Sequence, residues 1–314
     1  MKADPRWTPL TPAPTVMRHP VMAIAWVLLC ANILLQIAFP LTGGGTTAMT
    51  NASVALFSAA MLCAAGASYG LRGVAGLAVI AGGGGLAAET LGVHTGFPFG
   101  TYAYTGALQP ELLGVPIAVP AAWIMMSWPA FLVARRLAGR RRWAVIPIGA
   151  YALTAWDVFL DPQMVDRGYW RWASDTPGLP GVDGIPLSNF GGWLLVSAII
   201  MCLLYLIIPD RQPTSPPTIA PSSPTQFKHN RFGSPRFEDT QIGNAQIGNT
   251  QFGNTLFGST TIGVVAYLWT YFSSVIGHLV FFGRPLVALV GGIVMGVVAI
   301  PLAASVFDEM RRAR

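Results

Sequence analysis

Residues 87–105 of the chain read AAETLGVHTGFPFGTYAYT. This stretch leaves an apolar, glycine-rich run and carries Glu89 and His94 to a predicted membrane boundary. Because glycine is entropically costly in a helix and proline lacks an N–H, the residues from Gly92 to Gly100 are expected to stop the helix. An acid, an imidazole and several aromatic rings at such a boundary indicate a candidate site, and an interfacial aromatic belt with a snorkelling acid is the alternative. The rings belong to Phe97, Phe99, Tyr102 and Tyr104.

The composition around this stretch is that of a membrane protein. The 314 residues are 53% hydrophobic and 10% charged, whereas a soluble domain carries about 25% charged residues. Apolar runs of roughly 17–25 residues predict helices that cross a bilayer. We therefore predict an all-α, polytopic bundle of about eight transmembrane spans, in a multi-pass protein of the cell membrane. The spans are expected near 20–39, 52–70, 73–91, 115–134, 143–160, 191–208, 262–282 and 286–306.

The positive charges predict the orientation of the bundle. With eight spans and the N-terminus inside, 16 of the 19 Lys and Arg residues lie on the cytoplasmic side, and Arg167, Arg171 and Arg284 lie outside. Such an excess of cytoplasmic Lys and Arg is what the positive-inside rule describes. Both termini are therefore expected in the cytoplasm, and the basic balance indicates topology rather than nucleic-acid binding.

Four regions follow from the pattern of spans. A polar tail, 1–19, precedes a membrane core at 20–208 that carries spans 1–6 and the outer-face site. Residues 209–261 are rich in Pro, Ser and Thr and then repeat the pentapeptides QIGNA, QIGNT, QFGNT and LFGST. Some twenty residues of repeat are too few to stack into a solenoid, so we interpret this region as a low-complexity cytoplasmic insertion. Residues 262–314 supply the last two spans and a basic tail.

The acids near the outer ends of the spans carry the chemistry. Asp157 and Asp161 are four residues apart, hence on one face of a helix, and Glu89 leaves its span on the same side of the membrane. Two carboxylates in a poorly hydrated pocket cannot both ionise cheaply, so one is expected to keep a proton that it can donate. A hydrogen-bonded interhelical cluster without chemistry is the alternative.

Several signals predict where helices end. The Asp161–Pro162 step is expected to end the fifth span, because a residue before proline disfavours helical geometry. Ser188 or Asn189 is expected to cap the sixth span. The fourth span is expected to be kinked or broken by Pro116, Pro120 and Pro129.

Three motifs resemble the carotenoid hydratase family of integral membrane proteins, the carotenoid 1,2-hydratases that include the bisanhydrobacterioruberin type. They are GVHTGFPFGTYAYT, WDVFLDP with its two aspartates, and GIPLSNFGGW at 184–193. The resemblance covers roughly residues 20–208 and the last two spans, and the insertion has no counterpart in it.

The resemblance implies the addition of water across the terminal C1–C2 double bond of an acyclic carotenoid, which yields a tertiary alcohol. Protonation of the alkene needs a strong acid, and aromatic faces stabilise the resulting cation. His94 is expected to orient or deprotonate the water. The candidate catalytic residues are Asp157, Asp161, Glu89 and His94. The candidate substrate-binding residues are Tyr102, Tyr104, Trp156, Trp170, Phe97 and Asn189.

No cofactor or metal site is predicted. The three cysteines fall in spans without a CxxC partner, so no disulfide or zinc site is indicated. The expected partners are an acyclic carotenoid that enters from the lipid bilayer and other enzymes of carotenoid biosynthesis. Three alternatives stay open: a lyase-like or isomerase reaction on the same polyene, a Mg²⁺-dependent intramembrane prenyltransferase, and a small-molecule transporter.

Overall fold

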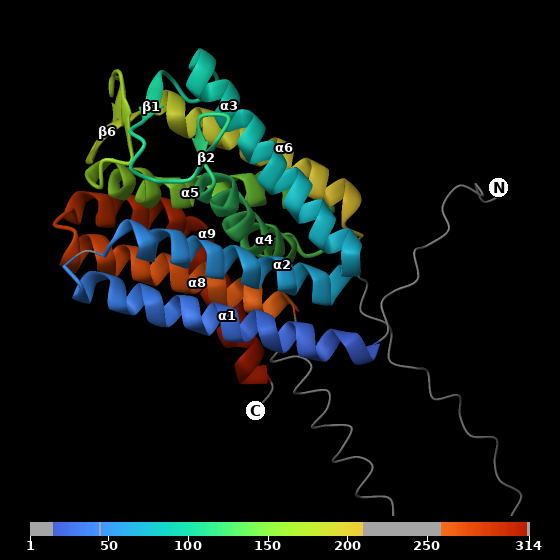
Figure 1. Cartoon of the computed structure of the whole chain (residues 1–314). Coiled ribbons are helices and arrows are strands. Elements are labelled where there is room, and N and C mark those ends of the chain that lie inside the picture. The colour runs from blue at the N-terminus through green and yellow to red at the C-terminus, as the bar shows by residue number, and fades with distance from the viewer. Residues whose placement is uncertain (1–14, 44, 210–258, 313–314) are drawn as a thin grey trace, which may run out of the picture. The chain divides into compact units, whose positions relative to one another are not determined.

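The computed structural model of the chain describes residues 15–43, 45–209 and 259–312 (Figure 1). Most of these residues are helical, so the predicted all-α membrane bundle is confirmed. The tail before residue 15 and almost all of the predicted insertion 209–261 lie outside the described residues. The helices are α1 (Thr15–Leu41), α2 (Thr47–Leu77), α3 (Gly84–Thr95), α4 (Ala118–Ala138), α5 (Val145–Asp166), α6 (Leu187–Ile207), α8 (Ser259–Ile276) and α9 (Pro285–Arg312).

Seven helices in the described part are long and apolar enough to cross a membrane, and one of them holds two of the predicted spans. This helical run, Thr47–Thr95, comprises α2, a π-helical segment at Ala78–Gly83 and α3. Its 49 residues would extend about 74 Å as one straight helix, more than twice the hydrocarbon thickness of a bilayer. The run is instead broken at Gly70, whose φ of 62° and ψ of −151° are non-helical.

The contacts around Gly70 show that the chain folds back there. A Cβ on Gly73 would lie 2.3 Å from the backbone oxygen of Ala65, although residues eight apart in a straight helix are separated by about 12 Å. Only glycine at position 73 permits this approach, because any side chain there would clash with Ala65. At position 70, glycine adopts the positive φ without the steric cost that a side chain would bring. The two halves of the run therefore correspond to the predicted second and third spans.

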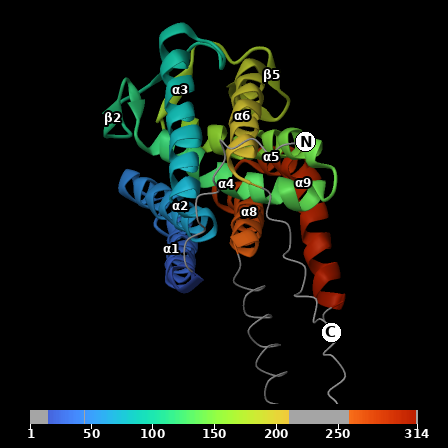
Figure 2. The same ribbon diagram turned by 90° about the vertical axis from the view of Figure 1, so that its right-hand side faces the viewer.

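α4 and α5 form the centre of the bundle. α4 packs against α2, α5 and α8, and α5 packs against α6 and α9. Figure 2 shows α1 and α2 on one side of α4 and α8, with α9 on the other. Large apolar side chains of α1 and α9 point outward, as is expected of surfaces that face lipid. Examples are Val27, Leu34, Ile293 and Ile300.

Pro162 does not end the fifth span, so that prediction is wrong. α5 continues through Pro162 to Asp166. A proline within a transmembrane helix removes one backbone N–H, and the packed neighbours compensate for the lost bond. The continuation keeps Asp161 within the helix and on the same face as Asp157.

The prolines of the fourth span do not break it either. α4 is one helix that contains Pro129, while Pro116 lies in the preceding strand. Pro120 falls in the first turn, where the missing N–H would have no helical partner in any case.

The predicted cap of the sixth span is also wrong. The residue before α6 is Pro186, which makes no side-chain capping bond. Ser188 instead donates its hydroxyl to the backbone oxygen of Phe99, and the Asn189 amide turns to the aspartates of α5.

Short strands gather at one end of the described bundle (Figure 1). They are β1 (Tyr102–Tyr104), β2 (Glu111–Leu112), β3 (Val115–Pro116), β4 (Trp170–Trp172), β5 (Gly178–Leu179) and β6 (Val182–Pro186). β1 pairs with β4 in antiparallel register, with Tyr102 opposite Trp172 and Tyr104 opposite Trp170. This pairing joins the segment after α3 to the segment after α5, and it positions the site described below.

The orientation of the bundle is open to a direct test. In a chain whose three native cysteines are replaced by alanine, Asp175→Cys should react with a membrane-impermeant maleimide on intact cells, because the charge split places this loop outside. Ser222→Cys, in the insertion and beyond the described residues, should react only after permeabilisation. Labelling of both cysteines from the same side would contradict the proposed topology.

Candidate active site

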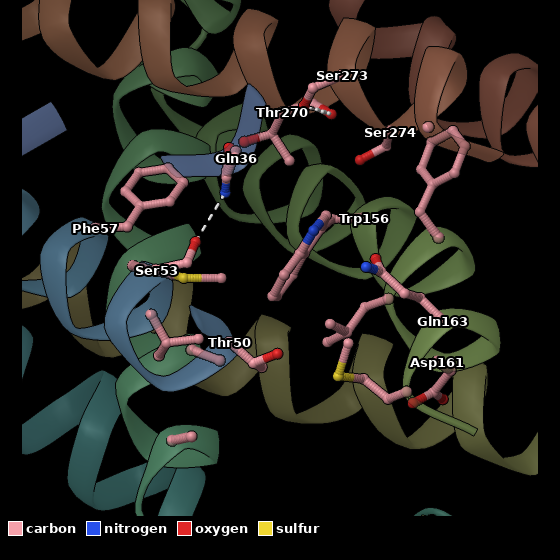
Figure 3. A pocket seen from close by; sticks show the side chains of 18 of the residues that line it. Gln36, Thr50, Ser53, Phe57, Trp156, Asp161, Gln163, Thr270, Ser273 and Ser274 are labelled. Carbon is pink, nitrogen blue, oxygen red and sulfur yellow. Dashed lines mark hydrogen bonds between the residues drawn. The ribbon is translucent and has the colours of Figure 1, made fainter. Parts of the chain in front are cut away.

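A pocket of about 480 Å³ lies among the helices and is bordered by the paired strands β1 and β4. This volume is within the range of pockets that hold small organic ligands. Most of the side chains that line the pocket are aliphatic or aromatic. Figure 3 shows Gln36, Ser53 and Thr50 along one wall and Asp161 and Gln163 on the opposite wall, with Trp156 between them.

Asp157 and Asp161 of α5 are held together by one amide. Asn189 of α6 donates through its side-chain nitrogen to Asp157 Oδ2 at 2.7 Å and to Asp161 Oδ2. An amide has two N–H donors, so one Asn189 side chain serves both carboxylates. All three side chains are buried.

The two aspartates are not equivalent. Asp161 lines the pocket, and its Oδ1 accepts a hydrogen bond of 3.1 Å from the Trp170 indole. Asp157 is 0% exposed and lies behind it, outside the pocket lining. Asp157 Oδ1 is one of the buried polar atoms without a hydrogen-bond partner among the described residues. Asp161 is therefore the acid that a ligand would meet, and Asp157 is its buried neighbour.

Glu89 has a different environment in the same pocket. Its Oε2 accepts hydrogen bonds from Tyr102 at 2.5 Å and Tyr104 at 2.9 Å, and its Oε1 accepts one from the Trp123 indole at 3.2 Å. A carboxylate accepts at every lone pair only when it is ionised. These three donors would stabilise the ionised form of this acid against the cost of burying its charge.

The two tyrosines are secure donors. Burial, followed by the negative charge of Glu89, raises the pKa of Tyr104 well above its usual value, and the same causes raise the pKa of Tyr102. Both phenols keep their protons at neutral pH. Gly92 lets Tyr102 reach α3, because a Cβ there would lie 2.9 Å from the Tyr102 hydroxyl.

Aromatic side chains surround the acids. Trp123 and Trp193 are stacked with their ring centroids 4.0 Å apart, and Trp156 meets Trp193 edge-on at 6.1 Å. Tyr102 and Trp172 lie 4.7 Å apart on the paired strands β1 and β4. The electron-rich faces of such rings attract a cation held against them.

His94 and Phe97 lie away from this site, contrary to the prediction from the sequence. Both side chains are exposed, and neither lines the pocket. The Nδ1 of His94 is 2.8 Å from the backbone oxygen of Thr90, within its own helix. The structure brings together the other eight predicted site residues: Asp157, Asp161, Glu89, Tyr102, Tyr104, Trp156, Trp170 and Asn189.

Three residues of the site were not predicted from the sequence. Trp123 binds Glu89, and Trp172 and Trp193 line the pocket. A signal existed for Trp123, because a buried tryptophan needs an acceptor for its N–H and the fourth span itself offers no acidic side chain. Asn189 was predicted to contact substrate, and it also bridges the two aspartates.

Within the described ranges, no three His, Cys, Asp or Glu side chains are grouped so that they could hold a metal ion. The described pocket lining also contains no Lys, Arg or His side chain.

Residues 49–228, more than half of the chain, match the sequence profile of the family described as "Carotenoid biosynthesis protein". The chain belongs to this family. The matched range includes every residue of the acidic site, from Glu89 to Asn189. The resemblance noted from three motifs is thus confirmed at the level of the family.

The chain is also similar to a curated protein, a bisanhydrobacterioruberin hydratase from Haloarcula japonica. The two are 32% identical over 120 residues, which are 37% of this chain and 39% of the relative. The chain thus spans about two fifths of the length of the curated relative that it matches. No solved structure matches the chain.

Proposed function

We propose that this protein hydrates the terminal C1–C2 double bond of an acyclic carotenoid end to a tertiary alcohol, within the cell membrane. The observation that carries the proposal is the contrast between two acids in one apolar pocket. Asp161 is paired with a second buried carboxyl, whereas Glu89 is saturated with hydrogen-bond donors. The name of the curated relative supports the same reaction type.

Asp161 is the proton donor in this proposal. It lines the pocket, and its negative charge would be opposed by Asp157 at its side. Close carboxyls favour a state in which the pair retains one proton. Transfer of that proton to C2 of the alkene forms a C–H bond and leaves a tertiary cation at C1.

The cation is expected to lie against the aromatic walls. Trp156, Tyr104 and Trp172 all line the pocket, and a desolvated cation–π contact stabilises by about 2 kcal/mol. Water then adds to C1 and passes a proton to the Glu89 carboxylate. Return of the proton to the aspartate pair completes a cycle that consumes one water and requires no change of oxidation state.

The pocket also has an opening suited to a lipid-soluble substrate. Its lining includes Ile37 and Leu41 of α1 and Phe272 of α8, which are 47%, 73% and 52% exposed. Large apolar side chains that face both the pocket and the surrounding membrane support entry between α1 and α8. The polyene would enter end-first, and the remainder of the chain would stay in the bilayer.

Two of the alternatives, the prenyltransferase and the transporter, fit this pocket less well. A prenyltransferase must neutralise a diphosphate, commonly with Lys or Arg, and none lines the described pocket. A transporter would need a polar path across the bundle, whereas Glu89 and Asp161 are hydrogen-bonded to side chains of the paired strands β1 and β4 at one end of it.

Pigment analysis tests the proposed function. A host that makes an acyclic carotenoid should yield a product heavier by one water when this chain is co-expressed, and the product from H₂¹⁸O should carry the heavy oxygen. The reason is that hydration takes its hydroxyl from solvent, whereas an oxygenase takes it from O₂. An unchanged pigment in membranes that contain the chain would contradict the proposal.

A further inference from the structure

The proposed hydration consumes water at a site that is walled by apolar groups and open toward lipid. Each turnover needs one water molecule beside the cation, and the opening between α1 and α8 is lined largely by apolar side chains. A polar path from the membrane boundary is therefore required. The polar side chains in contact with the pocket show where such a path could begin.

One cluster of polar side chains at the pocket forms hydrogen bonds between helices. Gln36 donates to Ser53 at 3.2 Å and accepts from the Trp269 indole at 2.6 Å, and Ser53 donates to Asn32 at 2.8 Å. These bonds join α1, α2 and α8, and they occupy the Gln36 amide and the Ser53 hydroxyl within the bundle. This group serves helix association, as interhelical polar contacts in membranes do.

Three hydroxyls form a second polar group, which leads from the pocket to the edge of the bundle. Thr50 lines the pocket and is 8% exposed, and its Oγ1 lies 3.3 Å from the hydroxyl of Tyr169. Tyr169 is 4% exposed and donates at 3.3 Å to Thr47, in the first turn of α2. Thr47 is partly exposed.

The surroundings of Tyr169 make its hydroxyl distinctive. Its ring packs with Leu108, Met164 and Trp170 in a small apolar cluster, yet the hydroxyl points to two threonines. Every hydroxyl in the series can both donate and accept. Bonds of 3.3 Å are longer than the usual O–H···O distance of about 2.7–2.8 Å, so they are weak and can be exchanged for bonds to water.

We propose that Thr47, Tyr169 and Thr50 form the path by which water reaches the pocket from the membrane boundary. The path rests on the proposed hydration, because it supplies the water that captures the cation. Tyr169 and Thr50 are positioning residues. Their hydroxyls form hydrogen bonds to water on its way to the pocket, and they take no part in protonation. In the chemical step, an O–C1 bond forms, an O–H bond of the water breaks and Glu89 accepts the proton.

The path predicts a change in how the cation is partitioned. In D₂O, protonation places deuterium on C2, and the cation then either captures water or loses a proton and returns as deuterated alkene. Tyr169→Phe and Thr50→Val should raise the ratio of deuterated alkene to hydrated product about fivefold, the factor for a lost hydrogen bond of about 1 kcal/mol. Thr50→Ser, which keeps the hydroxyl, should restore the wild-type ratio.

The control is Tyr267→Phe, which removes a buried hydroxyl that bonds to the Ala152 backbone outside the pocket. It should leave the ratio unchanged. Full-length protein in membranes is used throughout, and the ratio is independent of the amount of folded protein. An unchanged ratio in both Tyr169→Phe and Thr50→Val would overturn the path while leaving the hydration intact. Absence of deuterium from both alkene and product in the wild type would overturn the proposed function itself.

Discussion

Membranes that carry Asp161→Asn are expected to form hydrated carotenoid at less than about one hundredth of the wild-type rate, because general acid catalysis contributes about 10²–10⁴-fold. Asparagine preserves the shape of the side chain and can still meet Trp170 and Asn189. It has no acidic proton, so the alkene cannot be protonated from this position. Product formed per amount of inserted protein, measured by pigment chromatography, gives the rate.

Asp157→Asn should also lower turnover, although Asp157 does not line the pocket. The amide cannot share a proton with Asp161, so the pair loses the arrangement that keeps an acid protonated beside the substrate. We expect the loss to be smaller than for Asp161→Asn, because Asp161 remains in contact with the pocket.

Asp166→Asn is the matched control on the same helix. Asp166 forms an ion pair with Arg284 at the end of α5 and does not line the pocket. Its amide variant should keep near-normal specific activity. Near-normal hydration by Asp161→Asn would falsify the donor assignment and move the proton to Glu89.

The sequence predicted well those features that depend on local periodicity. The i, i+4 spacing of Asp157 and Asp161 predicted one shared helix face, and both now bond to the same amide. Eight apolar runs predicted the bundle, including the pair that meets at Gly70. Such features follow from helix geometry alone.

The same geometry argues against His94. Glu89 and His94 are five residues apart, which places them about 140° from each other around a helix of 3.6 residues per turn. They therefore face different surroundings on α3, one toward the pocket and the other outward. The prediction was wrong because it relied on the chemical character of the two side chains and did not consider their positions around the helix.

Other parts of the site depend on how distant segments meet. Trp123 reaches Glu89 from 34 residues away along the chain, and Trp172 lies in β4 beyond the whole of α5. At Pro162, a local signal favours the end of a helix, but the packing of neighbouring helices allows α5 to continue. Pairings of this kind are set by the tertiary fold, and no spacing in the sequence encodes them.

Glu89→Gln should separate the two halves of the proposed reaction. If Glu89 accepts the proton of the attacking water, its amide variant should lose at least about 10²-fold in hydrated product, the lower end of the range for a general base. Protonation by Asp161 should continue, so deuterium from D₂O should still enter the recovered alkene. Asp161→Asn, in contrast, should abolish both hydration and deuterium exchange.

Glu89→Gln is also expected to lower the stability of the folded protein. Tyr102 and Tyr104 donate to one oxygen of Glu89 and Trp123 donates to the other. An amide offers a single acceptor oxygen, so in either orientation at least one buried donor faces an NH₂ group, at a cost of about 1–3 kcal/mol. Thermal aggregation in detergent should show this loss of stability, whereas Glu111→Gln, an exposed acid on β2, should change neither stability nor turnover. Loss of deuterium exchange together with hydration in correctly inserted Glu89→Gln would make Glu89 part of the acid step rather than the base.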